Sequence, residues 1–144
     1  MKKLCFILIC VSLTLLFALS GCENRTFRYE YADLKSDVKI VQLAEIERDG
    51  YGGEISVEPI KQLDINSMDA FFKDLSNLEY ESKFMMHPEN VTGTVIIISY
   101  NEKTDYDYVG LQGIEQYRKN QEMKYINYRC DISHFEMIID EYFA

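Results

Sequence analysis

The sequence predicts an α+β domain in which an antiparallel sheet of about five strands carries two helices packed on one face. Three observations predict this class. The run VTGTVIIISY at residues 91–100 is rich in β-branched residues, segments 67–79 and 131–144 repeat apolar side chains at helical spacing, and turn signals separate the strands. The resulting order, ββαβββα, is typical of helices gathered on one face of an antiparallel sheet.

The first two strands are predicted to form a hairpin. Residues 38–46, VKIVQLAEI, favour a strand because β-branched and other apolar residues dominate them. The turn signal DGYGG at 49–53 follows, with three of the seven glycines. Residues 54–60 alternate apolar and polar side chains, and Pro59 places this second strand at a sheet edge or marks its end.

The first helix is predicted over residues 67–79, with Asn66 or Ser67 as its N-cap. The apolar stripe expected to face the sheet consists of Met68, Phe71, Phe72, Leu75 and Leu78. Residues 81–92 fit no regular element. Within them, Phe84 to His87 are expected to pack over a sheet edge or to rim a pocket.

Three more strands and a terminal helix are predicted after residue 90. The strands span residues 91–100, 105–112 and 123–130, and Asp131 caps the helix that follows. On the strand at 105–112, alternation places Tyr106 and Tyr108 on one side and Asp105 and Asp107 on the other, solvent-facing side. One face of the sheet is left without a predicted cover. We expect a binding site on that face or beside the loop at 84–87.

The N-terminus has the layout of an export signal. Lys2 and Lys3 precede an uncharged apolar run over residues 4–19, which is short for a permanent membrane span. The four residues Leu19, Ser20, Gly21 and Cys22 that end the run resemble the lipobox of bacterial lipoproteins. This resemblance implies that residues 1–21 are cleaved and that a diacylglycerol is attached to the Cys22 sulfur. It also implies a protein anchored by lipid to the cell membrane, on its extracytoplasmic side, because two acyl chains hold a protein stably on a bilayer.

Processing at residue 22 leaves a strongly acidic chain. Of 15 basic and 24 acidic residues, only Lys2 and Lys3 leave with the signal, so the mature net charge is 13 − 24 = −11. This balance excludes nucleic acid as a partner and opposes broad contact with anionic lipid. Residues 22–36 are expected to form the lipidated cysteine with a tether or short edge strand, and residues 37–144 a single domain.

Cysteine usage becomes simple after processing. Cys5 and Cys10 leave with the signal and Cys22 carries the lipid, so Cys130 has no partner for an intramolecular disulfide. The residue ends a predicted strand just before a helix, a position that favours a small core side chain. The alternative is a nucleophile paired with His134, as in a thiol-dependent hydrolase.

Neither a metal nor an organic cofactor is predicted. Asp105, Asp107 and Gly110 fit the first part of a calcium loop, but Gln116 stands where the bidentate glutamate would be needed. The two histidines, His87 and His134, do not have metal-binding spacing.

Two functions remain open. The favoured one is a non-enzymatic binding or protein-interaction module of the cell envelope, whose partner is an envelope protein, a glycan or a peptide paired to a sheet edge. The side chains expected to contact it are Tyr100, Tyr106, Tyr108 and Tyr117. The other is the small envelope enzyme that would use Cys130 and His134.

Overall fold

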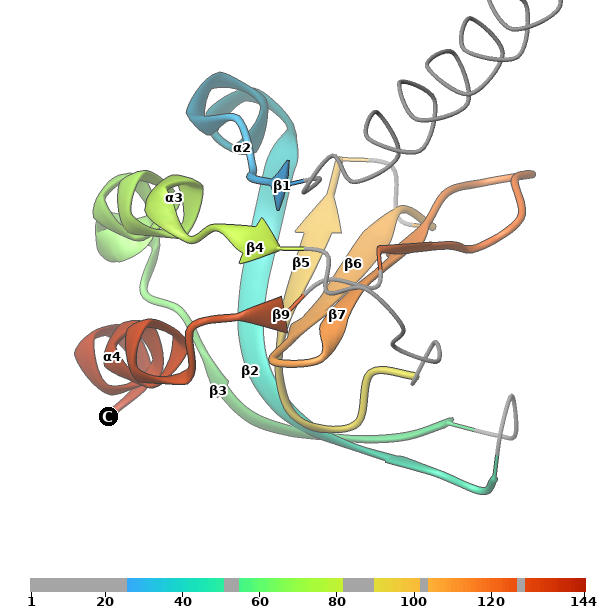
Figure 1. The fold of residues 1–144 in the computed structure, drawn as a ribbon. Coiled ribbons are helices and arrows are strands. Elements are labelled where there is room, and N and C mark those ends of the chain that lie inside the picture. The colour runs from blue at the N-terminus through green and yellow to red at the C-terminus, as the bar shows by residue number, and fades with distance from the viewer. Residues whose placement is uncertain (1–25, 51–54, 82–89, 102–103, 127–128) are drawn as a thin grey trace, which may run out of the picture.

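The computed structural model describes residues 26–50, 55–81, 90–101, 104–126 and 129–144, which confirm the α+β class and form two antiparallel sheets (Figure 1). The larger sheet has the strand order β3-β2-β5-β6-β7-β8. Its strands are β2 Val38–Arg48, β3 Ile55–Gln62, β5 Gly93–Tyr100, β6 Tyr106–Gly110, β7 Gly113–Tyr117 and β8 Lys124–Ile126. The smaller sheet, of order β1-β4-β9, consists of β1 Thr26–Phe27, β4 Tyr80–Glu81 and β9 Arg129–Cys130. The α-helices are α2 Tyr31–Asp37, α3 Met68–Asn77 and α4 Ile132–Phe143.

The predicted hairpin and the predicted central strand form the middle of the larger sheet. β2 pairs antiparallel with both β3 and β5, so that Ile46 lies opposite Val57 on one side and Gly93 on the other. β3 is the edge strand, as Pro59 indicated. The part of the predicted turn at 51–54 lies outside the described residues, as does the segment from Phe84 to His87.

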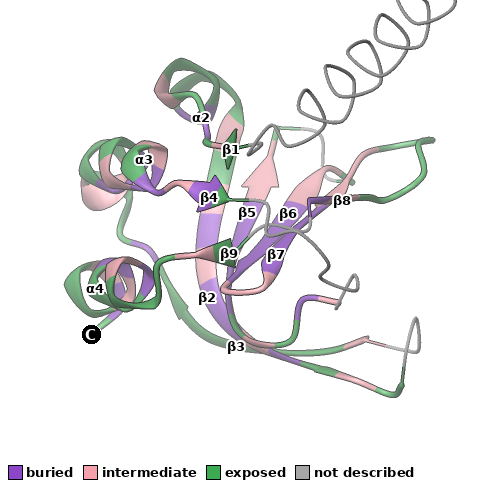
Figure 2. Cartoon of the chain, viewed as in Figure 1, coloured by how far each residue is buried: buried purple, intermediate pink, exposed green. Residues whose placement is uncertain are grey.

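All three helices pack on one face of the larger sheet, where the main core lies (Figures 1 and 2). Fully buried side chains of the helices meet those of β5 there, and they include Leu34, Phe71, Leu75, Phe135, Ile138, Ile96 and Ile98. Burial of each such side chain stabilises the fold by about 1.5–3 kcal/mol. The apolar stripes that predicted α3 and α4 are therefore the faces that these helices bury.

The two predicted caps have different outcomes. Asp131 caps α4 as expected, since its carboxylate accepts a hydrogen bond of 3.0 Å from the His134 amide. At α3 the N-cap is Ser67, one of the two predicted residues, but its side chain makes no cap hydrogen bond. A 3₁₀ turn at Ile65–Ser67 precedes that helix, and Asp64 accepts from the Asn66 amide at its start.

Each strand of the smaller sheet adjoins one end of α2, α3 or α4 in the chain. β1 leads into α2, β4 follows α3, and β9 leads into α4. In register, Phe27 lies opposite Tyr80, which lies opposite Cys130. The Tyr80 ring is fully buried, and its hydroxyl donates a 3.0 Å hydrogen bond to the Gly110 carbonyl in the larger sheet. Each helix thus starts or ends on a strand that is fixed to the main body.

Residues 26–36 belong to the folded body. A tether or a short edge strand was expected here. Thr26–Phe27 is a short edge strand of the smaller sheet, and a helix that was not predicted follows it. α2 is docked by Leu34, which is 1% exposed, and by contacts with Asp69 of α3 from Tyr31 and Lys35. Tertiary contacts therefore decided the conformation of a sequence whose local pattern was strand-like.

A second correction concerns the strands after residue 105. The predicted strand 105–112 ends at Gly110, and the unpredicted strand β7 follows after a two-residue turn of Leu111 and Gln112. Gly113 begins β7 with φ +156°, and a Cβ atom there would lie 2.5 Å from the Ile126 carbonyl oxygen. Gly110 and Gly113, which pair with each other, are the two sides of a tight hairpin.

The face of the larger sheet opposite the helices is not bare. It carries a second cluster of buried side chains, made of Ala44, Ile46, Val91, Val95, Ile97 and Tyr108. Figure 1 shows that the ends of β2 and β3 curl away from the plane of the other strands. The open face that we expected as a binding surface is therefore partly closed by a core of its own.

Candidate functional site

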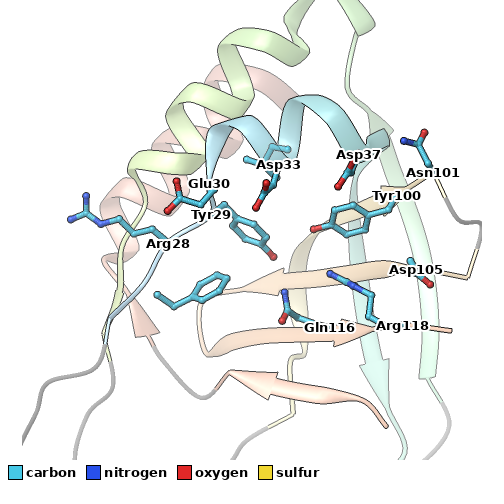
Figure 3. A pocket seen from close by; sticks show the side chains of 12 residues that line it. Arg28, Tyr29, Glu30, Asp33, Asp37, Tyr100, Asn101, Asp105, Gln116 and Arg118 are labelled. Atoms are coloured by element: carbon cyan, nitrogen blue, oxygen red, sulfur yellow. The ribbon is translucent and has the colours of Figure 1, made fainter. Parts of the chain in front are cut away.

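A cleft lies between α2 and the ends of β5, β6 and β7 that point toward that helix, and we call it the α2 cleft (Figure 3). It has a volume of about 550 Å³. Its aromatic lining is Phe27, Tyr29 and Tyr100, and its acidic lining is Glu30, Asp33, Asp37 and Asp105. Arg28, Asn101, Gln116 and Arg118 complete its polar lining. The segment that leads into α2 and the helix itself thus build one wall, and the sheet builds the other.

The floor of the α2 cleft rests on a buried carboxylate. Asp107 is 0% exposed, which contradicts the prediction that it faces solvent. It accepts hydrogen bonds from Tyr29 Oη at 2.7 Å, Tyr100 Oη at 2.8 Å, Gln116 Nε2 at 3.2 Å and Arg118 Nη1 at 2.6 Å. We call these five residues the Asp107 network. A buried charge persists when it is paired and fully hydrogen-bonded, and here four donors converge on two oxygens.

The network fixes Arg118 in one orientation. Besides Asp107, its Nη1 donates to the carbonyls of Tyr106 and Tyr117, and the guanidinium lies 4.6 Å from the centre of the Tyr100 ring. Burial lowers the pKa of the guanidinium, but the hydrogen bond and charge of Asp107 outweigh this and raise the pKa above its ordinary value. The group is therefore a permanent cation that has its counter-ion directly behind it.

The two tyrosines of the network stay neutral. Burial, and then the negative charge of Asp107, raise the pKa of Tyr29 and that of Tyr100 well above the ordinary value. Their hydroxyls consequently remain protonated donors at every physiological pH. Because these hydroxyls already donate to Asp107, the floor of the cleft is rigid and offers few further hydrogen-bond donors to a ligand.

The rim of the cleft keeps free carboxylates. Figure 3 shows Asp33 and Asp37 on α2 directed toward the cavity, with Glu30 beside them. Within the described part of the chain, neither Glu30 nor Asp33 has an ion-pair partner. The two cations of the lining are both neutralised, Arg28 by Glu79 and Arg118 by Asp107. The uncompensated charge of the cleft is negative.

The four tyrosines predicted to bind a partner do not share a surface. Tyr106, Tyr108 and Tyr117 form a tyrosine cluster on the face opposite the helices, where the rings of Tyr106 and Tyr117 stack 4.7 Å apart. Tyr100 lies on the other face, in the α2 cleft. Tyr108 is also largely buried, at 7% exposed. Of the four predicted tyrosines, Tyr100 therefore lies in the cleft, whereas the other three pack with the second core.

A second buried ion pair lies beneath the tyrosine cluster. Glu115 of β7 is 0% exposed and pairs with Arg48 at the end of β2. Its carboxylate also accepts hydrogen bonds from Tyr117 Oη at 2.8 Å and from the Val91 amide at 2.9 Å. The pair connects three separate segments of the chain, which indicates a structural role.

Cys130 and His134 line one cleft, of about 740 Å³, on the other side of β1. The thiol is half-buried and packs against the main core, close to the expected core position. Burial raises the pKa of the Cys130 thiol, although the nearby Tyr80 hydroxyl acts in the opposite direction. A raised pKa disfavours the thiolate that a nucleophile needs.

No known protein family, curated protein or solved structure matches this chain. The site must be judged on its own geometry. Among the described residues, no group of three or more His, Cys, Asp or Glu side chains is placed to hold a metal ion, and no helix has the length and hydrophobicity to cross a membrane. Cys22 and the rest of the lipobox lie outside the described residues.

Sequence reasoning missed most of the α2 cleft. Tyr29, Asp33 and Arg118 were not candidates, since the helix that brings the first two to the sheet was not predicted. One signal was present: Asp107 and Val109 occupy the same side of β6, and Val109 is an apolar residue. An aspartate in line with a core residue indicates a buried, paired carboxylate.

Proposed function

We propose that this protein is an extracytoplasmic lipoprotein, anchored by a diacylglycerol on Cys22, that acts as a non-enzymatic binding module of the cell envelope. The α2 cleft is its binding site, and the partner is an envelope protein that inserts a lysine or arginine side chain. The observation that carries this proposal is the combination of aromatic walls with free carboxylates at Glu30 and Asp33. Cationic groups bind favourably where a carboxylate and an aromatic face are both within reach.

The rigid floor supports a binding role. Ligand sites need polar groups that are held in place before the ligand arrives, so that little conformational entropy is lost. In the α2 cleft the Asp107 network holds Tyr29, Tyr100 and Arg118 from behind. None of these groups is poised to transfer a proton at neutral pH, because the two phenols have raised pKa values and the guanidinium is permanently charged. This favours recognition over catalysis.

The charge of the cleft also selects among partners. A neutral glycan would stack on exposed aromatic faces, but the Tyr100 ring already lies against the Arg118 guanidinium. A basic side chain gains from Glu30 and Asp33, whose carboxylates project at the rim. We therefore favour the envelope protein over the glycan as the partner.

Two measurements test this function. Intact mass spectrometry of the protein from its native membrane should find a chain that begins at Cys22 and carries the diacylglycerol; a retained leader or a free Cys22 thiol would refute the anchor. Binding of a tetralysine peptide to the lipidated protein should weaken with salt, because screening reduces the attraction between exposed charges. The double variant Glu30→Gln/Asp33→Asn should lose this binding.

A matched control removes the same charges elsewhere. Glu47→Gln/Asp49→Asn changes one glutamate and one aspartate, both exposed, at the far end of β2. It should retain tetralysine binding and crosslinking to the membrane partner. Equal binding by both double variants would show that net charge, and not the α2 cleft, attracts the peptide. Turnover of an ester or peptide substrate that requires Cys130 would instead favour the enzyme.

A further inference from the structure

The chain is fixed in the folded body from its first described residues. Thr26 pairs with Glu81 and Phe27 with Tyr80. The Phe27 side chain packs against the main core, and Tyr29 is buried, with its hydroxyl 2.7 Å from Asp107. The segment from Thr26 to α2 therefore cannot serve as an extensible tether, contrary to one of the two expectations for residues 22–36.

Only three residues then separate the lipidated position from the body. Four peptide steps join Cys22 to Thr26, and a fully extended chain of that length spans at most about 14 Å. A folded body of this size has a diameter of about 35 Å. The link is thus shorter than the radius of the object it holds, so the body cannot turn the side that carries β1 away from the membrane.

We infer that the folded body is held against the bilayer on the side of β1, so that the α2 cleft meets its partner at the membrane surface. This inference rests on the lipid attachment at Cys22 proposed above. The cleft is placed close to the anchor because four of its lining residues, 27–30, directly follow Thr26. Its partner must then present a basic group near the headgroups, as the extracytoplasmic segment of a membrane protein beside its transmembrane helix does.

Charge repulsion does not remove this restraint. The acidic body is repelled by anionic headgroups, but at physiological ionic strength that repulsion fades within about 8 Å. Since the link spans at most about 14 Å, the body can move only about 6 Å beyond this distance. We therefore expect the folded body to lie just above the headgroups, with β1 facing them. The ends of β2 and β3 that lie at the opposite corner of the molecule from α2 in Figure 1 then face away from the bilayer.

Site-directed fluorescence on vesicles tests this orientation. In a Cys130→Ser background, the lipidated protein is labelled at Ala32→Cys on α2 or at Ser56→Cys on β3, both exposed positions. Ser56 pairs with Glu47, nine residues along β2 from Val38, which is about 30 Å in strand geometry. The vesicles are phosphatidylcholine with a nitroxide quencher on the headgroup. We expect the nitroxide to quench the dye at position 32 and not to quench the dye at position 56.

A spacer variant completes the test. About 20 Gly/Ser residues inserted between Asn24 and Arg25 have a mean reach of about 25 Å and should abolish the quenching at position 32. Equal quenching at both positions of the unextended protein, with the lipid shown by mass spectrometry, would overturn the inference and leave the proposed function standing. A protein found without lipid would overturn the anchor itself, and the inference with it.

Discussion

Replacement of Asp107 by asparagine is the sharpest test of the Asp107 network. The side chain is fully buried and receives hydrogen bonds from Tyr29, Tyr100, Gln116 and Arg118. Asparagine keeps the size of the side chain but has one carbonyl oxygen, which accepts two hydrogen bonds. Its amide group presents two further donors to a site that already holds four. At least two of the present donors must lose their acceptor.

The free energy of unfolding should fall by about 3 kcal/mol. A hydrogen bond to a charged group contributes about 1.5–3 kcal/mol, so loss of two corresponds to about 3–6 kcal/mol. The lower end applies because the Arg118 side chain is 28% exposed and can regain water through the cleft. At about 3–6 °C per kcal/mol for a domain of this size, the melting temperature should drop by roughly 10–15 °C.

Urea unfolding of residues 22–144, with Cys22→Ser so that no lipid can be attached, measures this difference. Asp49→Asn is the matched control, since it removes the same charge from an exposed position at the end of the β2–β3 hairpin and should change stability by less than about 0.5 kcal/mol. A loss below about 1 kcal/mol for Asp107→Asn, relative to this control, would refute a desolvated network beneath the cleft.

The remaining predictions concern the opposite face of the sheet, the hairpin glycines and alkaline pH. Glu115→Gln should cost about 3–5 kcal/mol in urea unfolding, more than Asp107→Asn, because Arg48 is only 6% exposed and stays buried without its counter-ion; simultaneous Arg48→Met should recover part of the loss. Gly113→Ala should cost at least about 2 kcal/mol, because the new Cβ meets a strand carbonyl, whereas Gly50→Ala meets no atom and should cost only about 1 kcal/mol for its positive φ, as thermal melts can show. Burial, and then Glu115, raise the pKa of Tyr117 to about 12. Its neutral form therefore stabilises the fold fully below pH 10, and this contribution is lost between pH 10 and 12; Tyr117→Phe should flatten that part of the stability profile.

The sequence was most informative where one pattern had one explanation. The stripe of Phe71, Phe72 and Leu75 predicted α3, and Asp131 predicted the start of α4, because helical spacing and capping are local properties. The run at 91–100 predicted β5 because a strand buried on both faces must be apolar on both sides. These elements could be derived without knowledge of their neighbours.

The failures share a physical cause. α2 is a seven-residue helix, too short to be stable alone, and it exists because Leu34 and contacts with Asp69 dock it on the body. β7 was missed because a two-residue turn between Gly110 and Gly113 leaves little turn signal. The α2 cleft depends on both elements. A site that is built by tertiary contacts between weak local elements cannot be found from the pattern of either one.

The hydrogen bonds to the buried carboxylates of Asp107 and Glu115 show which side chains are already engaged and which remain available for binding. Tyr29 and Tyr100 donate to Asp107, and Tyr117 donates to Glu115. A buried carboxylate needs donors that also tolerate an apolar environment, and tyrosine supplies a hydroxyl on a large apolar ring. Of the four tyrosines expected to contact a partner, Tyr100 and Tyr117 thus have structural roles of this kind.

The carboxylates of Glu30 and Asp33, at the mouth of the α2 cleft, belong to neither of these networks. Glu30 and Asp33 lie within seven residues of Thr26, on the side of the body nearest the proposed anchor. Neither carboxylate has an ion-pair partner among the described residues. A basic group from a partner at the membrane is the counter-charge that we propose for them.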